Sequence, residues 1–372
     1  MNKIILFLLC FLLGSSFSTF AQGRDREIKI SRQQESPVKT VKVRGKGKIK
    51  NVVFMIGDGM SLAHMYSTWA ANKGKLNLEN CQTVGLAKTY CYDRLITDSG
   101  AAGTALATGH KTRYHAVGVD PLLTLTDLAA AKSKSTGVVV TCRLNDATPA
   151  AFCAHNSDRD QAEELIADYA GCGVDFIFGG GKRYFCERKD GRNILEEMKA
   201  LGYQTPENQE QLDAIQTGKV LAVWADHDLP RPSVRKEMLT ESTMKALELL
   251  SQNKKGFFLM VEASQIDDYG HANQLDPLVE EILDFDRTIG KVFEWAAADG
   301  ETLVVVTADH ETGGLTLVGG SLPEGEIIGK FSTGDHSGVM VPVYAFGPGA
   351  ELFTGIYENT DIFEKIKYLL KL

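Results

Sequence analysis

Five short apolar segments, continuous rather than alternating in pattern, constrain the fold of this chain more than any other feature. They are rich in Val, Ile, Phe and Leu, which is typical of strands buried on both faces of a sheet. The segments lie at 51–56, 138–141, 174–178, 257–261 and 302–307. Helical patterns lie between them, at 159–170, 191–201, 233–253 and 275–298. Because strands alternate with helices, the sequence predicts one α/β domain with a parallel sheet and right-handed crossovers.

Polar side chains follow four of these segments, where the strands are expected to end. In chain order they are Asp58; Asp146 and Thr148; Glu262, Asp267 and His271; and Asp309 and His310. In open α/β sheets the ligand crevice lies beyond the carboxyl ends of the strands. A single aspartate at a strand end usually caps a turn, but four such groups at one edge predict a shared binding site.

The residue types in this group match two kinds of metal ion. Imidazole and carboxylate ligands together suit zinc, and the set available for two zinc ions is Asp58, Asp267, His271, Asp309, His310 and His336. Oxygen ligands alone suit magnesium, and that set is Thr148, Glu262 and a shared Asp58. Two metal ions about 4 Å apart form a clamp for in-line displacement at phosphorus.

A run of small residues from Ser99 to Ala105 allows the backbone to approach another group closely. Asp98 is predicted to cap a helix that begins at Ser99, where unpaired N–H groups favour an anion. Taken alone, the run is better explained as a capped and tightly packed helix. A zinc ion beside the Ser99 hydroxyl would instead make it a nucleophile for phosphorus.

Length, charge and the N-terminal residues limit the classes of function. The chain has 372 residues and a formal net charge of −8, which argues against a dedicated nucleic-acid binder. Residues 1–21 have the pattern of a secretory signal, so we expect a periplasmic or secreted protein. Residues 22–48 are expected to form a solvated N-terminal arm, and 49–372 the catalytic domain. No later apolar run approaches the ~20 residues that a membrane span needs.

Six cysteines follow the expected signal, and this even number permits up to three disulfides in an oxidising compartment. Cys81 with Cys91, and Cys172 with Cys186, are among the pairs close in sequence, and the connectivity stays open. None has a CxxC spacing, so a cysteine zinc site is not expected.

Together, the motifs resemble those of the alkaline phosphatases, which are metal-dependent phosphomonoesterases with a serine nucleophile. The matching segments, in the family's order, are 57–60, 97–105, 146–151, 262–271, 307–311 and 336–338. The resemblance implies a three-layer α/β sandwich in which helices flank a central, mostly parallel sheet. It also implies small phosphate monoesters as substrates, two Zn²⁺ ions and one Mg²⁺ ion as cofactors, and no requirement for a nucleic-acid partner.

Position by position, the resemblance implies a role for each candidate residue. Ser99 would carry the phosphoryl group in a covalent intermediate, and Arg159 would grip phosphate with its guanidinium fork. The ligands implied for the zinc that activates water are Asp267, His271 and His336. Those implied for the zinc on Ser99 are Asp58, Asp309 and His310. Those implied for magnesium are Asp58, Thr148 and Glu262, with Asp146 near it, directly or through water.

Two features depart from the family pattern. Asp268 stands where relatives often have Lys or His, and it either weakens phosphate binding, turns to solvent, or helps Asp146 to order a metal-bound water. Only 25 residues separate His310 from His336, an interval in which larger relatives carry a crown at their dimer interface. The crown is therefore expected to be largely absent, and the protein to be a monomer or a weakly associated homodimer.

Three other functions compete with this interpretation. A sulfatase needs a Cys or Ser in a C/S-x-P-x-R type context, which the sequence around Ser99 does not supply. Phosphodiesterases of the same superfamily often use a threonine nucleophile and a different phosphate clamp, so Ser99 with Arg159 favours monoesters. A non-catalytic periplasmic metal or phosphate binder would not need the complete set of ligands together with a nucleophile. The sequence does not identify the physiological phosphoester.

Overall fold

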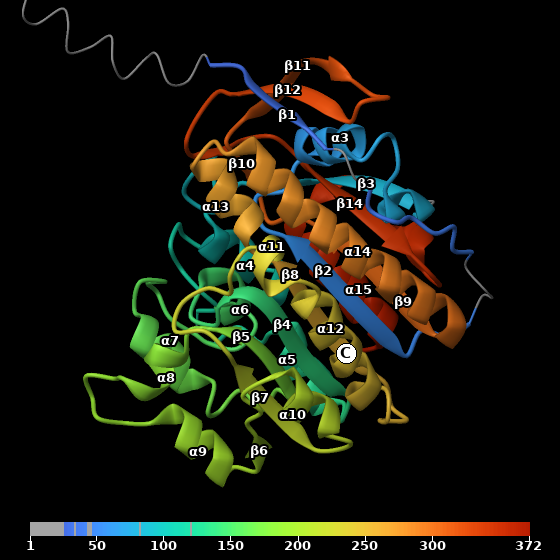
Figure 1. The fold of residues 1–372 in the computed structure, drawn as a ribbon. Helices are drawn as coiled ribbons and strands as arrows, with labels where there is room; N and C mark the ends of the chain where they lie inside the picture. Colours follow the sequence, from blue (N-terminus) through green and yellow to red (C-terminus); the bar gives the residue numbers. More distant parts are fainter. Residues whose placement is uncertain (1–25, 33–34, 43–46, 82, 120) are drawn as a thin grey trace, which may run out of the picture.

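A ten-stranded sheet forms the centre of the computed structural model, which describes residues 26–32, 35–42, 47–81, 83–119 and 121–372 (Figure 1). The strand order is β15-β3-β14-β9-β2-β8-β4-β5-β7-β6. Only β14 in this sheet runs antiparallel to its neighbours, so the expected mostly parallel sheet is confirmed. The bounds are β2 Asn51–Gly57, β3 Thr83–Lys88, β4 Ser135–Arg143, β5 Phe176–Gly180, β6 Tyr203–Gln204, β7 Lys219–Val223, β8 Phe257–Ala263, β9 Thr302–Thr307, β14 Val341–Phe346 and β15 Gly355–Glu358.

The five apolar segments of the sequence all lie in this sheet, as β2, β4, β5, β8 and β9. Every residue of β2, β8 and β9 is buried, which explains why their apolar pattern is continuous rather than alternating. The sheet is wider than the sequence predicted, because β14, β3 and β15 extend one edge and β7 and β6 the other.

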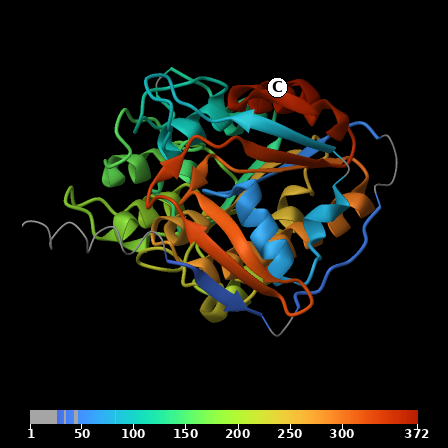
Figure 2. The same ribbon diagram turned by 90° about the horizontal axis from the view of Figure 1, so that it is seen from above.

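Helices cover both faces of the sheet, as expected for a three-layer sandwich (Figures 1 and 2). One face of the sheet packs against α12 and α14, and α3 lies beside α14. The other face packs against α5 and α15, and α4 packs on these two helices. The helices are α3 Leu62–Ala71, α4 Ser99–Thr108, α5 Leu125–Ala131, α6 Ala147–Ala150, α7 Ala162–Asp168, α8 Lys182–Cys186, α9 Ile194–Ala200, α10 Gln209–Ala214, α11 Pro232–Arg235, α12 Met238–Leu250, α13 Gln265–His271, α14 Leu275–Asp299 and α15 Asn359–Leu370, with short 3-10 turns η1 Asn77–Asn80 and η2 Ala350–Phe353.

Three of the predicted helices differ from the structure in their extent, and one of them, expected at 191–201, is α9 and begins only at Ile194. The segment 233–253 is not continuous, because Lys236 has a φ of 58° in the left-handed region and separates α11 from α12. The helix expected from residue 159 begins only at Ala162, and the N–H of Arg159 donates to the carbonyl of His115 at 2.8 Å.

A small second sheet contains part of the expected N-terminal arm. Its order is β1 (Ile28–Ser31), β12 (Glu326–Phe331) and β11 (Leu315–Ser321), and it packs on α3 (Figure 1). The strands β11 and β12 form a hairpin that fills most of the interval between His310 and His336, together with β10 (Glu311–Thr312). The interval in which the crown was expected to be largely absent therefore contains a compact hairpin.

The remaining predictions about targeting and cysteines have a limited structural outcome. The predicted signal, residues 1–21, lies outside the described residues. Among the residues that the structure describes, no helix combines the length and apolar character that a bilayer crossing requires. The six cysteines after Cys10 are free thiols in the structure, so the disulfides stay a prediction.

Candidate active site

Ser99 is the first residue of α4, and the local sequence explains its position. The carboxylate of the N-cap residue Asp98 accepts hydrogen bonds from the N–H groups of Gly100 at 3.0 Å and Ala101 at 3.2 Å. A Cβ atom at Gly103 would lie only 3.2 Å from the Cβ atom of Ala151, so the small residues let α4 pack closely against the α6 region. The predicted capped helix is therefore confirmed.

The hydroxyl of Ser99 faces the buried imidazole of His310. Its Oγ atom lies 3.2 Å from His310 Nε2. The same nitrogen lies 3.0 Å from Asp309 Oδ2 and 3.6 Å from Asp58 Oδ1. The three side chains Asp58, Asp309 and His310, from the ends of β2 and β9, thus converge next to the serine, and their ligand atoms are close enough to share one metal ion.

A second group of ligand atoms lies beside the first. The Nε2 atoms of His271 and His336 are 3.1 Å apart, and the carboxylate of Asp267 lies 3.2 Å from one and 3.6 Å from the other. A hydrogen bond from the other nitrogen orients each ring. Nδ1 of His271 donates to the carbonyl of Gly334 at 2.9 Å, and Nδ1 of His336 donates to the carbonyl of Thr97 at 2.8 Å. Orientation of a ligand histidine by a carbonyl on its other nitrogen is typical of metal sites.

The oxygen-only group lies on the other side of Asp58. The hydroxyl of Thr148 donates to Asp58 Oδ2 at 3.3 Å, and Glu262, at the end of β8, is completely buried. Burial, together with the charge of Asp309, raises the pKa of Asp58 well above its usual value. Burial, together with the charge of Asp146, does the same for Glu262. Such a group of buried carboxylates is costly unless a cation accompanies it.

The unsatisfied atoms of this region fit the expected metals. Asp58 Oδ1 and Glu262 Oε1 are buried and have no hydrogen-bond partner among the described residues. Because Nδ1 of both His271 and His336 donates to a carbonyl, the Nε2 atoms of the neutral rings both carry lone pairs, and these two acceptors lie 3.1 Å apart, as expected for ligands of a cation. The donor set combines nitrogen and carboxylate oxygen in one part and oxygen alone in the other, which suits zinc and magnesium respectively.

Arg159 reaches the same region from the loop before α7. Its Nη1 donates to Asp98 Oδ2 and its Nη2 to Asp146 Oδ1, both at 3.0 Å. The guanidinium is thus fixed beside the N-terminus of α4, with three of its five N–H donors free of these two carboxylates. All eleven residues predicted for the site therefore lie at one edge of the sheet.

Sequence reasoning missed several residues that hold the ligands in place. The Thr312 hydroxyl donates to Asp267 and lies 3.2 Å from His310 Nδ1, so it links the two groups of imidazole and carboxylate side chains. Asp335 has a ligand atom close to those of His271 and His336. Gly59, with a φ of 73°, donates its N–H to Asp309 Oδ1 at 3.0 Å. All three residues lie within two positions of a predicted ligand, which is the only signal that the sequence offered.

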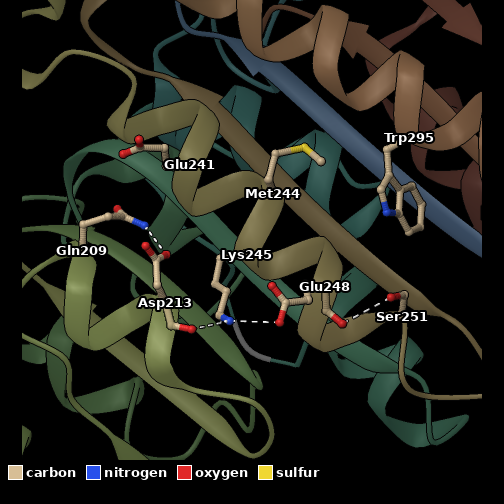
Figure 3. Close-up of a pocket in the computed structure, with 8 residues that line it drawn as sticks. All are labelled: Gln209, Asp213, Glu241, Met244, Lys245, Glu248, Ser251 and Trp295. Carbon is tan, nitrogen blue, oxygen red and sulfur yellow. Dashed lines mark hydrogen bonds and ion pairs between the residues drawn. The ribbon is translucent and has the colours of Figure 1, made fainter.

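Three cavities of about 550, 530 and 570 Å³, lined by described residues, lie away from this edge. One of about 550 Å³ is bordered by α10, α12 and α14, and is lined by Gln209, Asp213, Glu241, Met244, Lys245, Glu248, Ser251 and Trp295 (Figure 3). The ammonium of Lys245 already donates to Glu248 and to the carbonyl of Asp213, both at 3.0 Å. The pocket contains none of the predicted site residues.

Comparison with known proteins adds independent information. The alkaline phosphatase family model matches residues 49–331 and 326–372. Alkaline phosphatase 4 of Bacillus subtilis (strain 168) is 33% identical over 427 aligned positions, which cover 91% of this chain and 92% of the relative. The structure of alkaline phosphatase from the Antarctic bacterium TAB5 superposes with a TM-score of 0.84 and 38% identity, over 87% of this chain and 99% of the other. A variant of the TAB5 enzyme has been solved with Mg bound in its M3 site; it has a TM-score of 0.82 and 38% identity, over 87% and 98% of the two chains.

Proposed function

Since this chain belongs to the alkaline phosphatase family and is a phosphomonoesterase, we propose that it transfers the phosphoryl group first to Ser99 and then to water. The observation that carries the proposal is the position of Ser99 Oγ, at the N-terminus of α4 and 3.2 Å from His310 Nε2. A nucleophile in this position has backbone N–H groups behind it and a buried cluster of ligand atoms in front of it.

The two steps balance in atoms and charge. In the first, the bond from Ser99 Oγ to phosphorus forms while the bond from phosphorus to the leaving oxygen breaks, and the alcohol departs with a proton. In the second, water forms the new bond to phosphorus, the Oγ–P bond breaks, and the serine oxygen regains a proton. Arg159 binds two phosphate oxygens through both steps, and its pairing with Asp98 and Asp146 keeps the guanidinium oriented for them.

The geometry and the donor types support an assignment of residues to each metal. Asp267, His271 and His336 would hold one zinc ion, and Asp58, Asp309 and His310 the other. Asp58, Thr148 and Glu262 would hold magnesium, with Asp146 beside it. When bound, these ions lower the pKa of the attacking oxygen and neutralise charge on the leaving oxygen. The magnesium in the TAB5 variant supports the presence of a third site in this fold.

The proposal is tested by trapping the intermediate at acidic pH and locating the phosphate by mass spectrometry. Phosphate on a residue other than Ser99 would contradict it. Ser99→Ala should lose most of the turnover of an aryl phosphate monoester while it keeps the fold and the bound metals. Ser251→Ala, which alters a serine outside the site, is the matched control and should keep full activity. An aryl diester and an aryl sulfate, assayed in parallel, should be poor substrates.

Metal dependence, export and oligomeric state complete the proposal. Chelation should abolish turnover, zinc should restore more of it than magnesium alone, and full activity should need both. Full turnover by a thoroughly metal-free preparation would contradict the metal assignment.

We also propose that the protein is periplasmic or secreted, which fractionation of expressing cells tests. Sedimentation should show a monomer or a weak dimer, and a tight dimer at nanomolar concentration would contradict this.

A further inference from the structure

Ion pairs form a continuous chain from the rim of the site to the nucleophile helix. In order, the chain runs through Asp228, Arg143, Asp146, Arg159 and Asp98. Acids and bases alternate along it, so each interior side chain is paired on both sides. The last member caps the helix that begins at Ser99, but the first two have no role in the proposed mechanism.

Arg143, the last residue of β4, is fixed at two points by Asp228. Its backbone N–H donates to Asp228 Oδ1 at 2.8 Å, and its Nη1 lies 3.2 Å and 3.1 Å from the two carboxylate oxygens. Its Nη2 extends in the other direction and pairs with Asp146 Oδ2 at 2.9 Å. Because a planar guanidinium held by two carboxylates has little freedom to rotate, Arg143 provides a rigid support for Asp146.

The carboxylate of Asp146 is divided between two arginines. Its Oδ2 pairs with Arg143, while its Oδ1 accepts from Arg159 Nη2 at 3.0 Å and from the N–H of Ala147 at 2.7 Å. The orientation that Asp146 offers to Arg159 therefore depends on Arg143. Without Arg143, the oxygen Oδ2 would lose its cationic partner and the carboxylate could turn about its own side chain.

We propose that Arg143, supported by Asp228, is a positioning residue that orients Arg159 for phosphate through the carboxylate of Asp146. This inference rests on the proposed role of Arg159 in binding phosphate. The charge of Arg143 acts in the same direction, because it faces the carboxylates of Asp146, Asp228 and Asp268 at a rim that a phosphate dianion must approach. Loss of Arg143 thus disorders the phosphate clamp and leaves these carboxylates less neutralised.

The test measures phosphate binding separately from turnover. In Arg143→Met, both the KM for an aryl phosphate and the dissociation constant of inorganic phosphate should rise by about tenfold, which corresponds to about 1.4 kcal/mol. The dissociation constant is measured by titration calorimetry on the metal-loaded protein, so it does not depend on catalysis. kcat should change much less than KM, because Arg143 contacts neither the phosphate nor Ser99. Arg143→Lys, which keeps the charge but loses the planar fork, should recover part of the affinity.

Two controls separate positioning from a general structural effect. Arg192→Met removes an arginine whose Nε donates to Glu197 at 2.9 Å on the surface, and it should change neither constant. In an Arg159→Met background, Arg143→Met should cause much less additional loss of phosphate affinity, because the residue through which it acts is gone.

The outcomes distinguish this inference from the proposed function. If the wild-type protein binds phosphate and hydrolyses monoesters but Arg143→Met shows unchanged KM and phosphate affinity, the positioning role is refuted and the function stands. Fully additive losses in the Arg159→Met background would also refute it. If the wild-type protein neither binds nor hydrolyses phosphate compounds, both proposals are refuted.

Discussion

Substitution of Arg235 by methionine should destabilise the fold strongly and in a pH-dependent manner. Arg235, on α11, is a completely buried arginine that pairs with two equally buried carboxylates of α14. Its guanidinium donates to both oxygens of Glu281, at 2.7 and 3.0 Å, and to Asp284 at 2.7 Å. The hydroxyl of Thr141, in β4, donates to Glu281 at 3.4 Å and so ties the group to the central sheet.

The magnitude follows from what the substitution leaves behind. Two unit charges about 4 Å apart attract by about 4 kcal/mol at an effective dielectric constant near 20, so two carboxylates give Arg235 a gross attraction of about 8 kcal/mol. The cost of burying the arginine offsets part of this attraction, and the substitution removes that cost together with the side chain. Both carboxylates stay buried, however, and removing one member of a buried ion pair typically costs about 3–5 kcal/mol. We expect a loss in that range at about pH 8.

The sign of the pH dependence follows from the two acids. Burial raises the pKa values of Glu281 and Asp284 even with Arg235 present, and without it both pKa values rise further. Protonation of a carboxyl whose folded-state pKa is raised stabilises the folded state, and this contribution is lost as the pH rises through that pKa. The deficit of Arg235→Met should therefore be largest at alkaline pH and should shrink as the pH falls.

Urea unfolding of wild type and variant at about pH 8 and about pH 5.5 measures this difference, and metal linkage common to both proteins largely cancels. The variant Arg235→Met/Glu281→Gln/Asp284→Asn, which removes all three charges, should recover much of the lost stability at the higher pH. A loss below about 1 kcal/mol, or the same loss at both pH values, would refute the reasoning.

Three further predictions concern the site and the core. Gly59→Ala should lower the melting temperature and the zinc content, because a Cβ atom there would lie 2.8 Å from Thr312 Oγ1. The control Gly191→Ala has the same backbone cost of a left-handed residue, at a φ of 75°, but its Cβ atom would have no atom within 4 Å, so this variant should keep the zinc content of the wild type. Burial raises the pKa of Asp286 to about 6, so this residue should destabilise the fold as the pH rises through that value. In urea unfolding, the wild type should lose about 2–3 kcal/mol of stability relative to Asp286→Asn between about pH 4.5 and about pH 7.5, and a constant difference would contradict this. Asp268→Lys should tighten inhibition by inorganic phosphate at low ionic strength and slow kcat, and unchanged inhibition would show that Asp268 does not face the phosphate.

Sequence patterns predicted the centre of the fold better than its edges. The strands β2, β8 and β9 are buried on both sides, so their apolar segments are unmistakable. The strand β3, which lies next to the edge strand β15, has an exposed Val84 and no such segment, and the two-residue edge strand β6 is too short for any periodicity. The break at Lys236 depends on a left-handed residue other than glycine, which no composition signal marks.

The candidate site was predictable because its ligands follow strands whose carboxyl ends meet. Ser99, Asp309 and the other candidates are chemically distinctive residues in short motifs, and the parallel sheet brings them together. The residues that orient them are ordinary in sequence. Thr312 and Arg143 act through side-chain contacts that depend on how loops pack after the strands end, and a single sequence contains no record of those contacts.

The position of β2 in the sheet has a consequence for how the chain acquires its structure during synthesis. This completely buried strand is among the first to leave the ribosome, yet Val52 pairs with Phe258 and Leu303, which are made about 200 and 250 residues later. Parallel pairing over such distances is slow, because a long loop must close before any contact compensates for its entropy. Until β8 and β9 emerge, β2 is an unpaired segment of high β-propensity that is prone to aggregation. The nascent chain therefore stays without its central layer for most of translation, and chaperone binding to residues 51–57 over that interval should determine the yield of folded enzyme.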